Sequence, residues 1–256
     1  MTDTGQNKLI VALDVETADR ALALFEELRT VAGMFKIGSQ LFTAAGPDIV
    51  REIVAKGGKV FLDLKFHDIP NTVAAAGVEA TRLGVSIFNV HASGGVEMMK
   101  RTADAVSETA KREGIERPKV IAVTLLTSMD DETLGGIGID RAARQLVTHF
   151  ARAAADSALD GVVASPQEIE LIRSSVPQQK FLIVTPGIRS ATDAANDQRR
   201  TMTAAEAVGA GADYLVVGRP ITAAVNRVEA ARQIVVDMTA ALETDTSQRY
   251  TRISTD

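Results

Sequence analysis

One stretch of the chain, FLDLKFHDIP at residues 61–70, holds four side chains that can do chemistry: Asp63, Lys65, His67 and Asp68. The first three alternate with apolar residues, as in a strand that has one apolar and one charged face. Carboxylates at close range keep an ammonium group charged. An ammonium group fixed in this way can stabilise negative charge that develops on a substrate and can then donate a proton. This stretch is therefore the first candidate for a catalytic site.

A charged strand face also has a simpler interpretation, the solvated side of an antiparallel sheet. In a parallel barrel both faces are covered, so Asp63 and Lys65 would point into the barrel and would have to be paired. Asp14 and Lys36 stand near the ends of two earlier apolar runs, which gives two lysines and two carboxylates at one level. At about 4 Å and an effective dielectric near 20, each such pair interacts by about 4 kcal/mol before desolvation. This alternation of charge favours a functional site over a solvated strand face.

The elements that must position these charges are short β-branched runs that alternate with longer helical patterns. The expected strands are residues 8–15, 34–38, 59–66, 86–92, 119–127, 161–165, 181–187 and 213–219. Between them, apolar residues recur at three- and four-residue spacing, which indicates helices. Alternating strands and helices predict a parallel sheet, and eight units in 256 residues favour an α/β fold of the (β/α)₈ TIM-barrel type. A doubly wound open sheet is the alternative.

No linker divides the chain, so a single barrel domain is expected over residues 1–243, followed by a flexible polar tail at 244–256. The net charge of −5 gives no basic patch, which argues against a nucleic-acid partner. The absence of cysteine excludes disulfides, thiolate metal sites and cysteine nucleophiles. The first residues lack a secretory pattern, and no apolar run approaches the roughly 20 residues that span a bilayer. A cytoplasmic protein with no membrane contact is expected.

A second candidate site lies near the last two expected strands. Residues 188–203 form a long polar connection, which in a compact domain is typically functional or disordered. The eighth expected strand ends in Gly218 and Arg219, ahead of an expected helix start, where backbone N–H groups and a guanidinium group suit a phosphate dianion. Gln198, with its two following arginines at 199–200, can close over it as a lid. The alternative is a solvated loop with a structural arginine.

The sequence resembles the orotidine 5′-phosphate decarboxylase family from about residue 9 to residue 240. The signature of the family is DLKFHDIPNTV, here at residues 63–73. Seven supporting matches occur in the same order, and they are LDV at 13–15, FKIG at 35–38, NVHASGG at 89–95, TLLTS at 124–128, VTPGIR at 184–189, DQRR at 197–200 and VVGRPIT at 216–222. Members often carry glycine before the DQRR motif, where this chain has Asn196, and this departure concerns the hinge of the lid.

The resemblance implies a TIM barrel that converts orotidine 5′-monophosphate to uridine 5′-monophosphate and carbon dioxide, without a cofactor or a metal. Lys65 would protonate the carbon that loses the carboxylate, Asp63 would lie against that carboxylate, and Lys36 and Asp14 would bind the ribose. The other substrate-binding residues implied are Ser128 at the pyrimidine edge, Pro186 beside the ring, Arg189, and Gln198, Gly218 and Arg219 at the phosphate.

The resemblance also implies a homodimer in which Asp68, Ile69 and Thr72 reach into the neighbouring subunit's site, with Asp68 completing the charged array. His91 ends an expected strand and either lines the site or makes a structural hydrogen bond, and no histidine is assigned to a metal. Two rival functions remain. One is a sister barrel that decarboxylates 3-keto-gulonate 6-phosphate with Mg²⁺, since sister enzymes share D-x-K-x-x-D. The other is a non-catalytic nucleotide-binding barrel.

Overall fold

Eight parallel strands close into a barrel in the computed structural model, which describes residues 5–178, 180–188 and 202–253, with side chains as far as residue 244. The strands are β1 Leu9–Ala12, β2 Met34–Gly38, β3 Val60–Phe66, β4 Ile87–His91, β5 Lys119–Val123, β6 Gly161–Val163, β7 Leu182–Thr185 and β8 Tyr214–Val217. Each lies within a predicted strand. Leu9 in β1 pairs with Leu215 in β8, which closes the sheet and excludes the open-sheet alternative.

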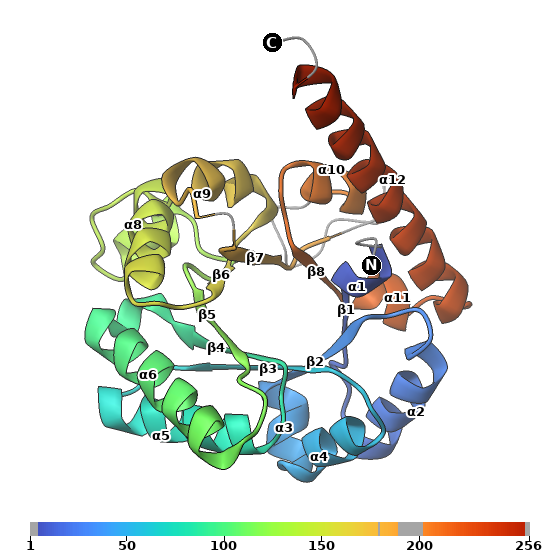
Figure 1. Ribbon diagram of the computed structural model, residues 1–256, viewed down its shortest axis with the longest axis horizontal. Coiled ribbons are helices and arrows are strands. Elements are labelled where there is room, and N and C mark those ends of the chain that lie inside the picture. The colour runs from blue at the N-terminus through green and yellow to red at the C-terminus, as the bar shows by residue number, and fades with distance from the viewer. Residues whose placement is uncertain (1–4, 179, 189–201, 254–256) are drawn as a thin grey trace.

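The helices form a ring around the barrel (Figure 1). They are α1 Gly5–Lys8, α2 Ala18–Leu28, α3 Ser39–Ala45, α4 Asp48–Ala55, α5 Pro70–Arg82, α6 Val96–Glu113, α7 Asp131–Gly136, α8 Ala143–Asp156, α9 Ile169–Ser175, α10 Ala204–Gly209, α11 Arg219–Thr222 and α12 Arg227–Ile253. Two 3₁₀ turns, η1 Ala92–Gly94 and η2 Pro166–Glu168, follow β4 and β6. The alternation of strand and helix confirms the predicted (β/α)₈ TIM barrel.

Side chains on alternate strand positions separate the core into two parts. Ile10, Met34 and Phe61 belong to a small apolar cluster formed by inward-facing residues. Their neighbours in the chain, such as Leu9 and Val11, belong to the much larger cluster that packs the sheet against the helices. Because side chains alternate along a strand, Asp63 and Lys65 fall on the inward side with Phe61, as predicted.

Local signals in the sequence explain where several helices begin and end. The Thr17 side chain accepts a hydrogen bond from the Arg20 N–H and caps α2. Thr203 and Glu206 form a reciprocal capping box at the start of α10. Gly114 ends α6 in the left-handed conformation, with φ of 67°, which glycine adopts without steric cost. These signals fix where α2 and α10 begin and where α6 ends.

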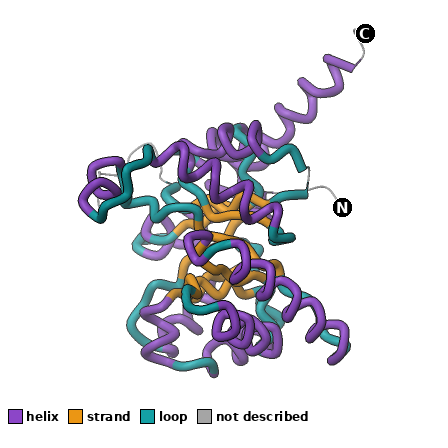
Figure 2. The backbone as a smooth tube through the Cα atoms, turned by 90° about the vertical axis from the view of Figure 1, so that its left-hand side faces the viewer, coloured by secondary structure: helices purple, strands orange, loops and turns teal. Residues whose placement is uncertain are grey.

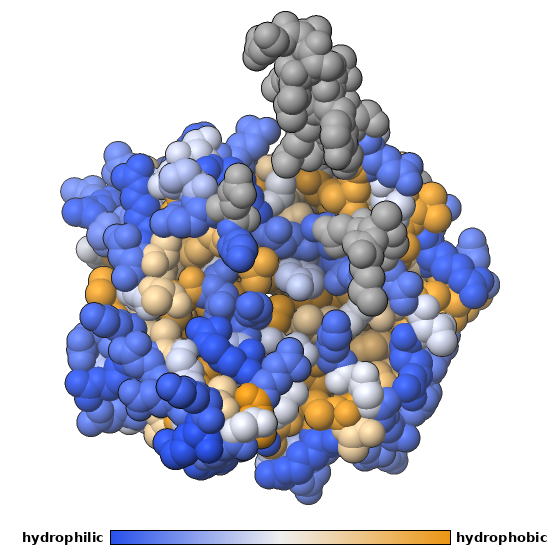
Figure 3. Space-filling view, in the orientation of Figure 1, coloured by the Kyte–Doolittle hydropathy of each residue, from blue (hydrophilic) through white to orange (hydrophobic). Residues whose placement is uncertain are grey.

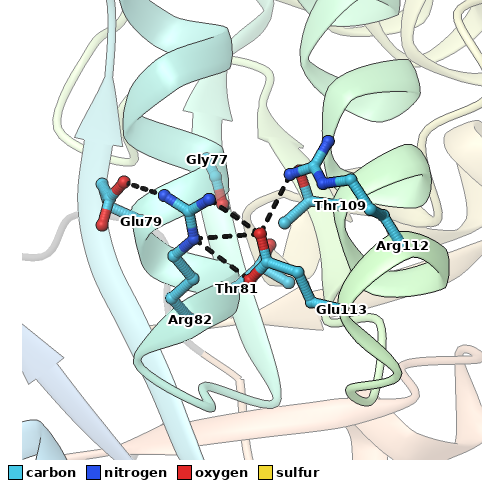
Figure 4. A network of polar contacts seen from close by, with 7 residues as sticks. All are labelled: Gly77, Glu79, Thr81, Arg82, Thr109, Arg112 and Glu113. Carbon is cyan, nitrogen blue, oxygen red and sulfur yellow. Dashed lines mark hydrogen bonds and ion pairs between the residues drawn. The ribbon is translucent and has the colours of Figure 1, made fainter.

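Helices α5 and α6 are also joined by a surface network of charges, shown in Figure 4. Arg82 at the end of α5 donates to the Glu113 carboxylate of α6, with an Nη2–Oε1 distance of 2.7 Å. Glu79 and Arg112 extend the network at each end. Hydrogen bonds from Arg82 and then Arg112 lower the pKa of Glu113 to about 2. The network links the C-terminal ends of two neighbouring helices.

The C-terminal segment differs in part from its prediction. Residues 244–256 were expected to be a flexible polar tail, but α12 continues to Ile253 and extends beyond the barrel, as Figure 2 shows. The polar composition hid the helix because adding a residue to an existing helix costs little, even where no apolar stripe marks it. Whether this segment is flexible, and whether residues 1–243 act as one domain, stay predictions.

The face that Figure 3 shows is covered largely by hydrophilic side chains, with smaller apolar patches between them. Within the described ranges, none of the helices is long and apolar enough to span a membrane. The apolar residues that the sequence supplies are instead used between the sheet and the helix ring.

Candidate active site

A cavity of about 840 Å³ opens where the barrel strands end. Seven residues predicted as site residues line it: Asp14, Lys36, Asp63, Lys65, Pro186, Gly218 and Arg219. They come from β1, β2, β3, β7 and β8 or from the residues that follow these strands directly. Active sites of TIM barrels lie at this end. The fold therefore gathers at one place residues that are up to about 200 positions apart in the chain.

The four charged residues form one connected row inside this cavity. Lys36 lies between two carboxylates, with its Nζ 2.8 Å from Asp14 Oδ1 and 3.5 Å from Asp63 Oδ2. The Lys65 Nζ lies 2.6 Å from Asp63 Oδ1. Asp63 thus holds one ammonium group on each of its oxygens. Carboxylates and ammonium groups alternate along the row, so every charge has an opposite charge as its neighbour.

Asp63 is the central charge of the row, and its side chain is only 13% exposed. Burial raises the pKa of its carboxyl group, but the charges of Lys36 and Lys65 and hydrogen bonds from Lys65 and Asn89 outweigh this effect. The net result is a pKa below the ordinary value, so Asp63 is a carboxylate at neutral pH. The row therefore keeps a fixed anion between two lysines.

The backbone at Lys65 departs from a regular strand. Lys65 has a φ of 52°, which is uncommon for any residue other than glycine. Leu62 pairs with Phe88 and Phe66 with Val90, so three residues of β3 face one residue of β4. Such a bulge re-aims side chains and occurs often beside active sites. The Lys65 ammonium group reaches Asp63 from this irregular position.

Asn89 of β4 stands opposite this bulge and is not among the site residues predicted from the sequence. It is fully buried, its Oδ1 accepts a hydrogen bond from the Lys65 N–H at 2.8 Å, and its Nδ2 donates to Asp63 Oδ1 at 2.7 Å. A signal for it exists in the sequence, because asparagine is depleted in strands. An asparagine at an inward position of a barrel strand must find buried polar partners.

Gly38, at the end of β2, leaves room for the row. A Cβ atom built at this position would lie 3.0 Å from Lys36 Nζ and 3.3 Å from Asp14 Oδ1. Gly38 is also in register with Asp63 on the neighbouring strand. A side chain at position 38 would therefore crowd the Asp14–Lys36 pair, and the two charged groups would have to shift to admit it.

Comparison with known proteins gives the family. Residues 7–234 match the Orotidine 5'-phosphate decarboxylase / HUMPS family. The chain belongs to this family. The match covers the whole barrel from β1 to β8 and includes every residue of the charged row.

Relatives with known names support this membership in the Orotidine 5'-phosphate decarboxylase / HUMPS family. An orotidine 5'-phosphate decarboxylase of Geobacter sulfurreducens is 53% identical over 238 residues, which cover 93% of this chain and 98% of that protein. One of Geotalea daltonii is 52% identical with the same coverage. The crystal structure of orotidine 5'-phosphate decarboxylase from Lactobacillus acidophilus has a TM-score of 0.79 at 34% identity, and covers 90% of this chain and 98% of that one.

Not all residues predicted from the resemblance to orotidine 5′-phosphate decarboxylases line the cavity. Ser128 is exposed and is absent from the lining, whereas its neighbour Thr127 contributes to the wall. The loop after β5 presents one of two adjacent hydroxyl residues to the cavity, and the sequence pattern alone does not say which. Arg189 and Gln198 lie outside the described residues, as do Asn196 and the arginines at 199–200.

The three residues predicted to reach a second subunit lie away from this chain's own cavity. Asp68, Ile69 and Thr72 are exposed and do not appear in its lining. Ile69 is 67% exposed. Asp68 Oδ1 accepts a hydrogen bond from the Ile69 N–H at 2.6 Å. The three therefore form an outward-facing group at the start of α5.

The histidines at this end lie beside the row but outside the cavity lining. The rings of His67 and His91 are 5.5 Å apart. Burial lowers the pKa of His91, and the nearby charges of His67 and Lys65 lower it further. A neutral His91 cannot add a positive charge to the row at neutral pH. In the described part of the chain no group of three His, Cys, Asp or Glu residues is arranged to hold a metal ion.

Proposed function

We propose that the protein decarboxylates orotidine 5′-monophosphate to uridine 5′-monophosphate and carbon dioxide, the last step of de novo pyrimidine nucleotide synthesis. The observation that carries this proposal is the Lys65 ammonium group, held 2.6 Å from the Asp63 carboxylate at the wall of the cavity. Membership in a family whose named relatives are orotidine 5'-phosphate decarboxylases supports the same substrate.

The chemistry needs a fixed cation. When the bond between C6 of the pyrimidine and the carboxylate carbon breaks, carbon dioxide leaves and the electron pair stays on C6 in the plane of the ring. The ring π-system does not delocalise this pair well, so the barrier must fall by electrostatic stabilisation. Lys65 provides the positive charge beside C6 and then transfers a proton to it. The neutral amine of Lys65 regains a proton from solvent after the product leaves.

The other charges of the row hold Lys65 and the sugar. Asp63 lies beside the substrate carboxylate and anchors the Lys65 ammonium group, and Lys36 and Asp14 bind the ribose hydroxyl groups. The contact of Lys36 with both carboxylates supports this division, because it makes the ribose site and the reacting site parts of one network. Binding of the ribose would then help to set the position of Asp63.

The phosphate binds at the end of β8, beside β1. Gly218 and Arg219 line the cavity at the start of α11, where a guanidinium group and backbone N–H groups can hold a dianion. Arg189 and Gln198 complete the grip from the connection after β7. Binding energy from this remote phosphate can be used to close and orient the site.

The pyrimidine ring is held between β5 and β7. Pro186 borders the ring, and a hydroxyl group from the loop after β5 holds its polar edge. The family resemblance implies Ser128 for this hydrogen bond to the pyrimidine. Thr127 is the alternative, because it lines the cavity. Comparison of Thr127→Val with Ser128→Ala decides between them. The variant that raises the KM for orotidine 5′-monophosphate about 10-fold or more identifies the contact, since one lost hydrogen bond is worth about 1.5 kcal/mol.

The protein acts as a homodimer with shared sites. Asp68, Ile69 and Thr72 reach into the neighbouring subunit, where Asp68 adds a second carboxylate beside Lys65. Their exposure and their absence from this chain's own cavity support this arrangement. Coexpressed Asp68→Ala and Lys65→Ala chains should recover activity in isolated heterodimers, because one of the two sites then has both residues intact. Inactive heterodimers would contradict shared sites.

An absorbance assay tests the reaction itself. Purified protein should consume orotidine 5′-monophosphate at the same rate with and without a chelator, and uridine 5′-monophosphate should be the product. Loss of activity on chelation would favour a metal-dependent sister reaction such as the decarboxylation of 3-keto-gulonate 6-phosphate. Binding without turnover would favour a nucleotide-binding barrel.

A further inference from the structure

We infer that Asn89 is the positioning residue that fixes Lys65 for the reaction. The inference rests on the proposed role of Lys65 and goes beyond it by naming what sets the position of the lysine. Asn89 does not line the cavity, so it acts through its two partners and not by contact with substrate.

Both polar groups of the Asn89 side chain form hydrogen bonds, one to Lys65 directly and one to the carboxylate that binds Lys65. Its Oδ1 accepts from the Lys65 backbone N–H at 2.8 Å, and its Nδ2 donates at 2.7 Å to Asp63 Oδ1. The same Asp63 oxygen receives the Lys65 ammonium group at 2.6 Å. Asn89 therefore fixes the lysine at both ends, directly at its backbone and through Asp63 at its Nζ.

The orientation of the amide is set by its partners. An N–H group faces one side of Asn89 and a carboxylate faces the other, so only an oxygen suits the first and only an NH₂ group suits the second. The side chain is fully buried, and water therefore does not compete for either hydrogen bond. Isosteric residues cannot replace it: aspartate lacks the donor and leucine lacks both groups.

Asn89 also accounts for the irregular backbone of Lys65. Three residues of β3 face Asn89 alone on β4, so the Lys65 N–H donates to a side-chain oxygen where a regular ladder would supply a carbonyl oxygen. A non-glycine residue with φ of 52° persists only when its surroundings hold it there. The Asn89 side chain supplies that restraint at the residue that would deliver the proton.

The test compares Asn89→Ala with a control that loses a buried hydrogen bond elsewhere. A reacting group displaced by about 1 Å can cost about 10²-fold in rate, so kcat of Asn89→Ala should fall about 10²-fold while KM stays within about 3-fold. Thr102 in α6 is fully buried and donates to the Met98 carbonyl oxygen at 2.8 Å. Thr102→Val should lower the melting temperature without a change in kcat. A kcat of Asn89→Ala within about 3-fold of wild type overturns the inference.

A second variant, Asn89→Asp, keeps the acceptor for the Lys65 N–H and places a carboxylate where Asp63 now receives a donor. The charged groups that act on Asp63 are Lys36 from β2 and Lys65 from its own strand. The imidazole of His91 from β4 also lies near Asp63, but it is neutral at neutral pH. An added anion beside them raises the pH at which Asp63 takes up a proton. The acid limb of kcat/KM should therefore move to higher pH in Asn89→Asp, and a limb that stays at the wild-type pH overturns the inference.

Lys65→Ala, measured in parallel, separates this inference from the proposed function. If Lys65→Ala retains turnover, the proposed function fails. If Lys65→Ala loses turnover while both Asn89 variants keep it, only the positioning role fails. Should neither Asn89 variant yield folded protein, Asn89 is a determinant of the fold and the positioning role is likewise overturned.

Discussion

The two ends of this barrel use carboxylates in opposite ways. Where the strands begin, Asp160 and Asp213 each accept a hydrogen bond from a backbone N–H of the neighbouring strand and from one arginine. Asp160 Oδ2 receives Val120 N–H at 2.8 Å and Arg117 at 2.7 Å. Each acid therefore joins one strand to the next and receives a hydrogen bond from a guanidinium group.

The second of these acids repeats the pattern two strands further on. Asp213 Oδ2 receives the Ile183 N–H at 2.7 Å and Arg173 at 2.5 Å. Arg173 also donates to the carbonyl oxygens of Gly211 and Phe181, so its donors are directed to the backbone. At this end the charges connect segments of main chain, as expected of residues that stabilise the fold.

Where the strands end, the charges bind one another and face a cavity. Asp63 connects two ammonium groups, and neither of its oxygens receives a backbone N–H among the contacts seen in the described chain. The residue that organises this end is a side-chain amide, Asn89. The charged groups that stabilise the fold therefore form hydrogen bonds with the backbone. The charged groups proposed for the chemistry bind one another and face a cavity that a substrate can fill.

The strongest test of this difference between the two ends is to remove one lysine from each end. Lys65→Ala should lower turnover by more than about 10³-fold, at least roughly 4 kcal/mol of transition-state stabilisation, because the cation beside the reacting carbon is lost. Lys119 lies at the start of β5 with its Nζ 3.8 Å from Asp160 Oδ1. Lys119→Ala should leave turnover unchanged in a steady-state absorbance assay. Equal effects of the two variants would contradict the assignment of chemistry to one end.

Removing an acid from each end should give complementary results. Asp63→Ala should lower kcat about 10²-fold or more, because the Lys65 ammonium group loses its anchor. Asp213→Ala should lower the free energy of unfolding by about 1.5–3 kcal/mol and leave kcat near wild type, because it frees a charged hydrogen bond and a backbone N–H. Urea denaturation and initial rates on the same preparations measure both quantities. A lower kcat in fully folded Asp213→Ala would contradict the assignment of a purely stabilising role to the acids where the strands begin.

The pH dependence of the unfolding free energy tests the charge state of Asp63. The pKa of Asp63 is lower in the folded protein than in the unfolded chain, where it is about 3.9. Ionised Asp63 therefore contributes stability that is fully present above about pH 5 and is lost as the pH falls through its folded-state pKa. The difference in unfolding free energy between wild type and Asp63→Asn should shrink between about pH 5 and pH 3. A difference that grows on acidification would show the opposite shift.

The smallest effect is expected from the exposed network between α5 and α6. Glu113→Gln removes the charge that Arg82 and Arg112 share. Exposed pairs contribute little and are screened by salt. We expect a fall in Tm of no more than about 4 °C at low ionic strength, less in 1 M salt, and no change in turnover. A larger fall that persists in high salt would mean that this surface network is as important to the fold as the pairs at Asp160 and Asp213.

Most of the fold follows from local patterns, because each strand is a short β-branched run between helical segments. Closure of the barrel was predicted from the number of strand–helix units and not from a local pattern, since the pairing of Leu9 with Leu215 leaves no mark on either segment. The helix at 244–253 also lacked a signal, because its polar residues form no apolar stripe.

In the site, charge alternation was enough to place Asp14, Lys36, Asp63 and Lys65 together. Asn89 was missed because periodicity assigns a residue to a face but does not reveal a bulge, and the bulge is what brings the Lys65 N–H to its side chain. The choice between Thr127 and Ser128 depends on how one loop turns after β5, which residue types alone do not fix.

The bare backbone at Gly38 limits how this barrel can be redesigned. A single methyl group there would enter the space that the Lys36 ammonium group and the Asp14 carboxylate now share. Libraries that vary the lining to admit new substrates should therefore hold position 38 constant and draw their diversity from the apolar wall around Leu125 and Val163. For protein engineers, the space beside Gly38 should be preserved together with the charged residues that it accommodates.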